Sequence, residues 1–220
     1  ELPGHGRTGF TDGGASLSGF GLMLFEWVLN SLPSGTKPIL VGHGLAGAVV
    51  VRSAATYSAF YSQAVIVDPS YDAAFSADAA IVSDLAATDW DTFINDVEAG
   101  LQTMPAWAYL ASAACAGGRY DQVRDMLSSA AAAAVAEFGA SALSGGTWGP
   151  GISFLLSSVG VPTHVLAGAL DADRSVAAQL MASEIPGATY VPLDGAGGMS
   201  AFEAREVVTA ALLGLINDCV

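Results

Sequence analysis

The chain has 220 residues, of which 52% are apolar, so it can bury one large core, or a core with an inserted cap, and disorder is not expected. Its formal net charge is −14 with a single lysine, so its surface repels nucleic acid and anionic lipid, and neither is expected as a partner. The acidity is more simply explained by solubility than by a dedicated partner.

Cysteine and histidine are few and dispersed. Cys115 and Cys219 are too few for a disulfide framework, and His5, His43 and His164 lack the spacing of metal ligands. No uninterrupted apolar run of about 18 residues occurs, so no membrane span is expected. We therefore expect no metal, no cofactor and a cytoplasmic location.

The first 70 residues predict a loop, a helix, and two buried strands with a helix between them. Segment 1–14 is glycine-rich and turn-like, and segment 16–32 carries apolar residues at helical spacing. Short apolar runs predict buried strands at 39–41 and 64–67, the second followed by a loop that starts with Asp-Pro, and the helix at 48–57 lies between them. The turn before this helix carries the glycine-rich sequence "VGHGLAG".

The middle of the chain has a different pattern. Residues 71–150 contain helical segments and no convincing strand, and we interpret them as a helical cap inserted into a core formed by 1–70 and 151–220. The core then continues with a strand at 161–168, an acidic loop at 169–174, a helix at 177–187, a strand at 189–195 and a helix at 201–218. This alternation predicts an α/β fold, with a parallel sheet covered by helices and ligands bound at the C-terminal ends of the strands.

Four motifs resemble those of the α/β-hydrolase family, in the family's order: "ELPGHGRT", "LVGHGLAG", "GALDAD" and "DGAGGM". The first resembles the loop after the family's fourth strand, the second its nucleophile elbow, the third its acid loop and the fourth its histidine loop. Asp171 and Gly198 are 27 residues apart, a family-like spacing. The resemblance covers nearly the whole chain and implies the α/β-hydrolase fold.

The resemblance places the family's catalytic triad on Gly44, Asp171 and Gly198. Only the acid is retained, because glycine stands at both the nucleophile and the histidine position. His43 is the variable neighbour of the nucleophile position, and in the family its side chain normally points away from the pocket. Two of the three triad roles are therefore vacant.

The resemblance also implies that the family's first four strands, with a loop that supplies one oxyanion-hole amide, are absent from these 220 residues. The strand at 39–41 would then present an unpaired apolar edge, which promotes association. We expect this edge to be covered either by a preceding segment of a longer protein or by a strand of a second copy in a homodimer.

Covalent ester hydrolysis is not expected without a nucleophile and a base. The helix after Gly44 still aims its N-terminal amides at the site, and the Leu45 N–H takes the family's oxyanion-donor position. We therefore expect a small apolar carbonyl compound to undergo cyclisation, elimination, decarboxylation or isomerisation, with Asp171 or Asp68 as general acid or base. The substrate-binding candidates are His43, Leu45, Trp107, Tyr109 and Met199.

Two further hypotheses stay open. A non-catalytic binder descended from a hydrolase would use the same turn as a cradle for a carbonyl group or an anion. A serine hydrolase inactivated by engineering would carry substituted glycines at 44 and 198. Each feature also has a structural explanation, since glycine tolerates a strained turn, Asp171 can cap a loop, and the cap aromatics can fill a core.

Overall fold

The computed structural model describes residues 9, 16–69, 152–198 and 200–217. The helical cap expected at 71–150 and nearly all of the loop expected at 1–14 fall outside these residues. In chain order the elements are α1 (Leu17–Ser31), β1 (Ile39–His43), α2 (Leu45–Thr56), η1 (Ser58–Phe60), β2 (Gln63–Val67), α7 (Ser153–Leu156), β3 (Thr163–Gly168), α8 (Ala172–Glu184), β4 (Thr189–Leu193), α9 (Ser200–Glu203) and α10 (Arg205–Asn217).

The four strands form one parallel sheet in the order β1-β2-β3-β4. At their C-terminal ends His43 pairs with Val67 and Val67 with Leu166, so the loops that follow β1, β2 and β3 leave the sheet at the same edge. The expectation of an α/β fold with a parallel sheet is confirmed. A ligand site is expected at this edge of such a sheet.

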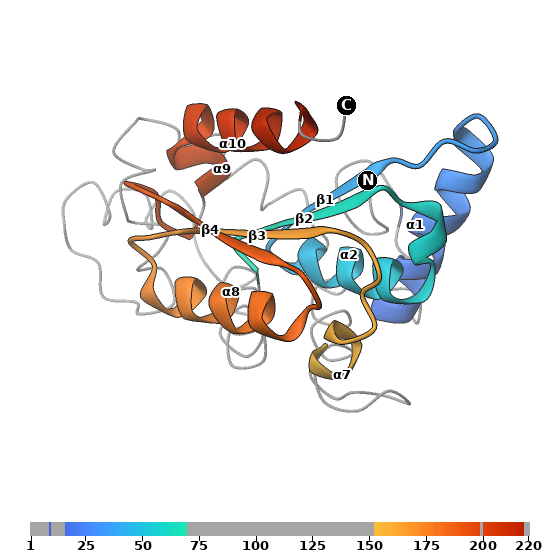
Figure 1. The fold of residues 1–220 in the computed structure, drawn as a ribbon, viewed down its shortest axis with the longest axis horizontal. Helices are drawn as coiled ribbons and strands as arrows, with labels where there is room; N and C mark the ends of the chain where they lie inside the picture. Colours follow the sequence, from blue (N-terminus) through green and yellow to red (C-terminus); the bar gives the residue numbers. More distant parts are fainter. Residues whose placement is uncertain (1–8, 10–15, 70–151, 199, 218–220) are drawn as a thin grey trace.

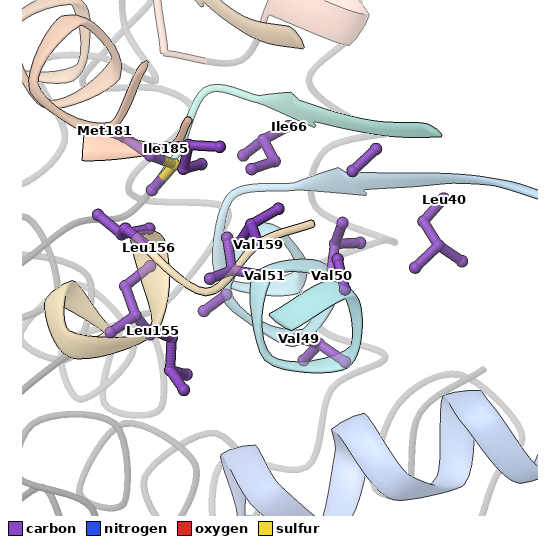
Figure 2. Close-up of a cluster of buried hydrophobic side chains, with 14 of the residues drawn as sticks. Leu40, Val49, Val50, Val51, Ile66, Leu155, Leu156, Val159, Met181 and Ile185 are labelled. Atoms are coloured by element: carbon purple, nitrogen blue, oxygen red, sulfur yellow. The ribbon is translucent and has the colours of Figure 1, made fainter. Parts of the chain in front are cut away.

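Helices cover both faces of the sheet (Figure 1), with α2 and α8 on one side and α10 on the other. Side chains alternate along a strand, so Ile66 packs with the α2 side while Val65 and Val67 pack with Val208 of α10. All five residues of β2 are buried, as expected for a central strand covered on both faces. Figure 2 shows the larger core, in which Val51 of α2 and Met181 of α8 lie near β2.

The strand β1 lies at one end of the strand order. Its inward positions Leu40 and Gly42 are buried against α2, but the side chain of Val41 is 53% exposed. Within the described residues no strand pairs with the other side of β1. The expectation that a further segment or a second copy covers this edge stays a prediction.

Three helix boundaries in the structure differ from those predicted from the sequence. The helix after the glycine-rich turn begins at Leu45 and not at Ala48. The helix α8 begins at Ala172, so the acidic loop is only three residues long, because Asp171 caps the helix with its side chain. The C-terminal helix is divided at Ala204 into α9 and α10. None of the described helices is long and apolar enough to cross a membrane.

Candidate functional site

The turn between β1 and α2 is built from three glycines with different requirements. A side chain at Gly42 would lie 2.5 Å from the Ala46 carbonyl oxygen, and one at Gly47 would lie 2.8 Å from Ile66 Cγ2. These two glycines let the strand, the turn and the helix pack closely. Gly44 is different, because a Cβ there would meet nothing within 4 Å.

Gly44 is the tip of this turn and adopts φ 56° and ψ −124°, a conformation that strains any L-residue. Its N–H donates to the Val67 carbonyl at 2.9 Å, which fixes the tip against the end of β2. It also serves as the N-cap of α2 but has no side chain to cap the first amides of the helix. Among the described residues no side chain caps the positive end of α2, which begins with the half-buried Leu45, so its first amides can act as donors.

Asp68 is the polar centre of this edge of the sheet. It follows β2 directly, its side chain is 0% exposed, and its φ of 47° is positive. Oδ1 accepts a hydrogen bond from the Gly168 N–H at 2.9 Å, and Oδ2 accepts from the Ser200 N–H at 2.9 Å and from Ser200 Oγ at 2.6 Å. The carboxylate thus joins the ends of β2 and β3 to the start of α9.

His43 is the third residue that contacts this carboxylate. Its Nε2 lies 3.2 Å from Asp68 Oδ2, and its side chain is 33% exposed. Burial alone would raise the pKa of the Asp68 carboxyl, but the hydrogen bond and charge of His43, with the bonds from Ser200 and Gly168, hold that pKa below its ordinary value of 3.8. The Asp68 side chain is therefore a buried anion.

Asp171 is held by Arg174. Its Oδ1 accepts from the Arg174 N–H at 3.0 Å, and its Oδ2 lies 3.6 Å from Arg174 Nε. The same guanidinium donates from Nη1 to the backbone carbonyl of Asp68 at 3.0 Å. Arg174, which is 7% exposed, therefore links the acid loop to the end of β2.

The loop that contains Gly198 packs directly against the acid loop. The N–H of Leu170 donates to the Ala196 carbonyl at 2.9 Å, and a side chain at Gly168 would collide with the backbone of Ala196 and Gly197. Gly198 itself is buried. The topology therefore gathers the elbow, Asp68, the acid loop and this glycine loop at one edge of the sheet.

Sequence reasoning named several residues of this edge and missed two. Trp107, Tyr109 and Met199 lie outside the described residues, so their expected contact with substrate stays a prediction. Arg174 carried a usable signal, since it stands three residues after Asp171, one helical turn away. Ser200 carried none, because its bond to Asp68 spans 132 residues.

A metal is not indicated by the geometry of the described residues, which contain no group of three His, Cys, Asp or Glu placed to hold one.

Residues 1–211 match a family model described as "Alpha/beta hydrolase family". The chain therefore belongs to the α/β-hydrolase family. No curated protein sequence matches it.

Solved structures share the fold. MenH from S. aureus superposes with a TM-score of 0.76 at 20% identity, over 100% of this chain and 82% of that one. The esterase from Exiguobacterium antarcticum gives a TM-score of 0.75 at 12% identity, over 99% of this chain and 80% of that one. The enol-lactonase from Burkholderia xenovorans LB400 gives 0.68 at 15% identity, over 99% and 79%. Similarities at these identities establish the fold alone.

Proposed function

We propose that this α/β-hydrolase-family chain binds a small apolar carbonyl compound at the N-terminal end of α2 and converts it without a covalent intermediate. The reaction would be a cyclisation, an elimination, a decarboxylation or an isomerisation. The observation that carries the proposal is Gly44, which occupies the strained tip of the turn and has no side chain with which to attack.

The family's hydrolytic route needs an attacking oxygen, a base for its proton, and donors for the oxyanion. In this proposal Gly44 and Gly198 stand at the positions of nucleophile and base, so the first two are missing. The donors remain, because the uncapped amides of α2, including the Leu45 N–H, point out of the helix end beside Gly44. Fixed donors of this kind can stabilise a carbonyl oxygen or the enolate derived from it.

The comparisons support the kind of ligand only in general terms. An esterase and an enol-lactonase are among the proteins that share the fold, and an ester or a lactone contains a carbonyl group. A carbonyl-containing ligand is therefore consistent with these two proteins that share the fold, although the reaction proposed here is not a hydrolysis.

Proline substitution at the first residue of two helices tests whether the amides of α2 bind the carbonyl compound. Leu45→Pro removes one N–H at the first position of α2, where proline is tolerated and where the preceding Gly44 has no Cβ to meet the proline ring. Ala172→Pro makes the same change at the first position of α8, after Asp171 in extended conformation, and is the matched control. The probe is cyclohexanone, and its binding to the wild-type chain and both variants is measured by ligand-observed NMR.

We expect Leu45→Pro to weaken the binding of cyclohexanone about tenfold, the weight of one hydrogen bond, and Ala172→Pro to leave it unchanged. No binding to the wild-type chain, or equal affinity in all three proteins, would overturn the proposal. Binding of carbonyl compounds without any conversion would instead favour the non-catalytic binder.

A second candidate, an inactivated serine hydrolase, is favoured by the space at Gly44. Because a Cβ there meets nothing within 4 Å, a serine side chain has room. The double variant Gly44→Ser with Gly198→His should then hydrolyse p-nitrophenyl acetate, while Gly44→Ser alone should not. A well-folded double variant that does not hydrolyse p-nitrophenyl acetate would eliminate this candidate.

A further inference from the structure

The histidine that precedes the turn at Gly44 contacts a buried carboxylate. His43 immediately precedes Gly44, and its Nε2 lies 3.2 Å from Oδ2 of the fully buried Asp68. In the resemblance this position is a variable neighbour whose side chain points away from the pocket. Here the side chain is part of the polar centre at the C-terminal edge of the sheet and is one-third exposed.

The surroundings of Asp68 single out His43 among the groups on the carboxylate. The other three hydrogen bonds come from the Gly168 N–H and from the N–H and hydroxyl of Ser200, which are uncharged donors. A buried carboxylate without a cation is costly, and an imidazole that gains a proton reduces this cost. Among the described residues, His43 is the only partner of this carboxylate with a titratable side chain.

Asp171, the retained acid of the triad pattern, is placed differently. Both of its oxygens face Arg174, which is itself buried and bonded to the Asp68 carbonyl. Both oxygens of Asp171 are thus engaged by this one residue. The Nδ1 atom of His43, in contrast, accepts or donates no hydrogen bond within the described part of the chain.

We propose that His43, oriented by Asp68, is the acid–base residue of the carbonyl site, and that Asp68 is its positioning residue. This inference rests on the proposed function and assigns its proton transfer to one residue pair. The arrangement repeats the aspartate–histidine half of a catalytic triad, with the histidine moved from the loop of Gly198 to the end of β1.

The step balances without a further reactant. Neutral Nδ1 of His43 takes the proton α to the bound carbonyl, and the electron pair of that C–H bond forms an enolate whose oxygen is held by the Leu45 N–H. The imidazolium then returns a proton to carbon, at the same atom or at a conjugated one, so that exchange or isomerisation results. Asp68 stabilises the imidazolium in between and keeps its own charge.

Solvent exchange tests this directly on the full chain. Cyclohexanone is incubated with the protein in D2O, and the uptake of deuterium at its α-carbons is followed by NMR across pH. His43→Gln removes the proposed base, and His164→Gln is the matched control, since His164 lies in β3 and bonds to Thr189 at the start of β4, the opposite end of the sheet. Asp68→Asn tests the positioning role, and circular dichroism checks the fold of each variant.

We expect the wild-type chain and His164→Gln to accelerate the exchange equally, and His43→Gln to lose about 100-fold or more of the acceleration. Asp68→Asn should keep part of the rate and leave the binding of cyclohexanone unchanged, because Asp68 orients the imidazole and does not touch the ketone. A merely structural role of Asp68 would weaken the binding of cyclohexanone, measured by ligand-observed NMR, together with the rate.

A failure of the proton-transfer inference can be distinguished from a failure of the proposed function. If cyclohexanone binds but no exchange exceeds that of buffer, the proton-transfer inference is overturned and the binding proposal survives. If cyclohexanone does not bind, the proposed function itself fails. Exchange that persists in His43→Gln, or that is lost in Asp171→Asn while His43→Gln stays active, would overturn the assignment and place the base elsewhere.

Discussion

Replacing Asp68 with asparagine measures how strongly its carboxylate holds the strand ends together. Asparagine keeps the size of the side chain and tolerates the positive φ of 47° as aspartate does, so backbone strain is unchanged. The carboxylate accepts the Gly168 N–H on Oδ1 and the Ser200 N–H on Oδ2. An amide has only one oxygen, so in either orientation one of these two buried N–H groups faces an NH2 group and loses its acceptor.

The expected loss of stability follows from this one buried N–H group that has no acceptor. One unsatisfied buried donor costs about 1–3 kcal/mol, and hydrogen bonds to a charged acceptor are the stronger ones, so the remaining bonds also weaken. We expect Asp68→Asn to lower the free energy of unfolding by about 3 kcal/mol at neutral pH. In urea unfolding, this loss appears as a lower denaturation midpoint with an unchanged m-value. The matched control is Asp194→Asn, at an exposed position after β4, for which a change within about 0.5 kcal/mol is expected.

Acid should remove the difference between the wild-type chain and Asp68→Asn. The folded-state pKa of Asp68 is lowered, so its stabilising effect is fully present above its ordinary value of 3.8 and is lost as pH falls through the folded-state pKa. At that point both proteins carry a neutral side chain. A difference below about 0.5 kcal/mol at neutral pH, or one that persists unchanged in strong acid, would refute this account of Asp68.

Three glycine substitutions test the turn and one helix by the same urea unfolding. Gly42→Ala places a methyl group 2.5 Å from the Ala46 carbonyl oxygen and should destabilise by about 1–3 kcal/mol or more, so a neutral effect would contradict the close packing. Gly44→Ser has space for its side chain but keeps φ at 56°, so it should fold with a loss of about 1–3 kcal/mol; a variant that fails to fold would contradict the open space. Gly214→Ala, within α10 and with nothing within 4 Å, should stabilise by about 0.5–1 kcal/mol, and a loss of stability would show that this position is packed.

Local patterns were sufficient for the sheet and most helices. The apolar run before Asp68 predicted a buried strand, and β2 is buried along its whole length because helices cover both faces. The start of α8 was missed because it depends on a single side chain, that of Asp171, which accepts the Arg174 N–H and brings residues 172–176 into the helix.

The polar centre could be predicted only in part. That Asp68 and Gly168 lie at the ends of neighbouring parallel strands follows from the strand pattern. The direction of the His43 side chain toward Asp68 does not, since it depends on the bond that forms across the sheet and on the left-handed backbone at Asp68. The contribution of Ser200 is set by how α9 packs over the strand ends, which no local pattern in the sequence encodes.

The central claim is that α2 amides beside Gly44 hold a carbonyl oxygen without help from a nucleophile. It is tested most directly by the carbonyl-carbon NMR resonance of cyclohexanone labelled with 13C at that atom, recorded free and bound. Polarisation by fixed donors predicts a downfield displacement on binding to the wild-type chain, largely lost in Leu45→Pro and kept in Ala172→Pro. A bound ketone whose carbonyl resonance does not move, or moves equally in both variants, would contradict the claim.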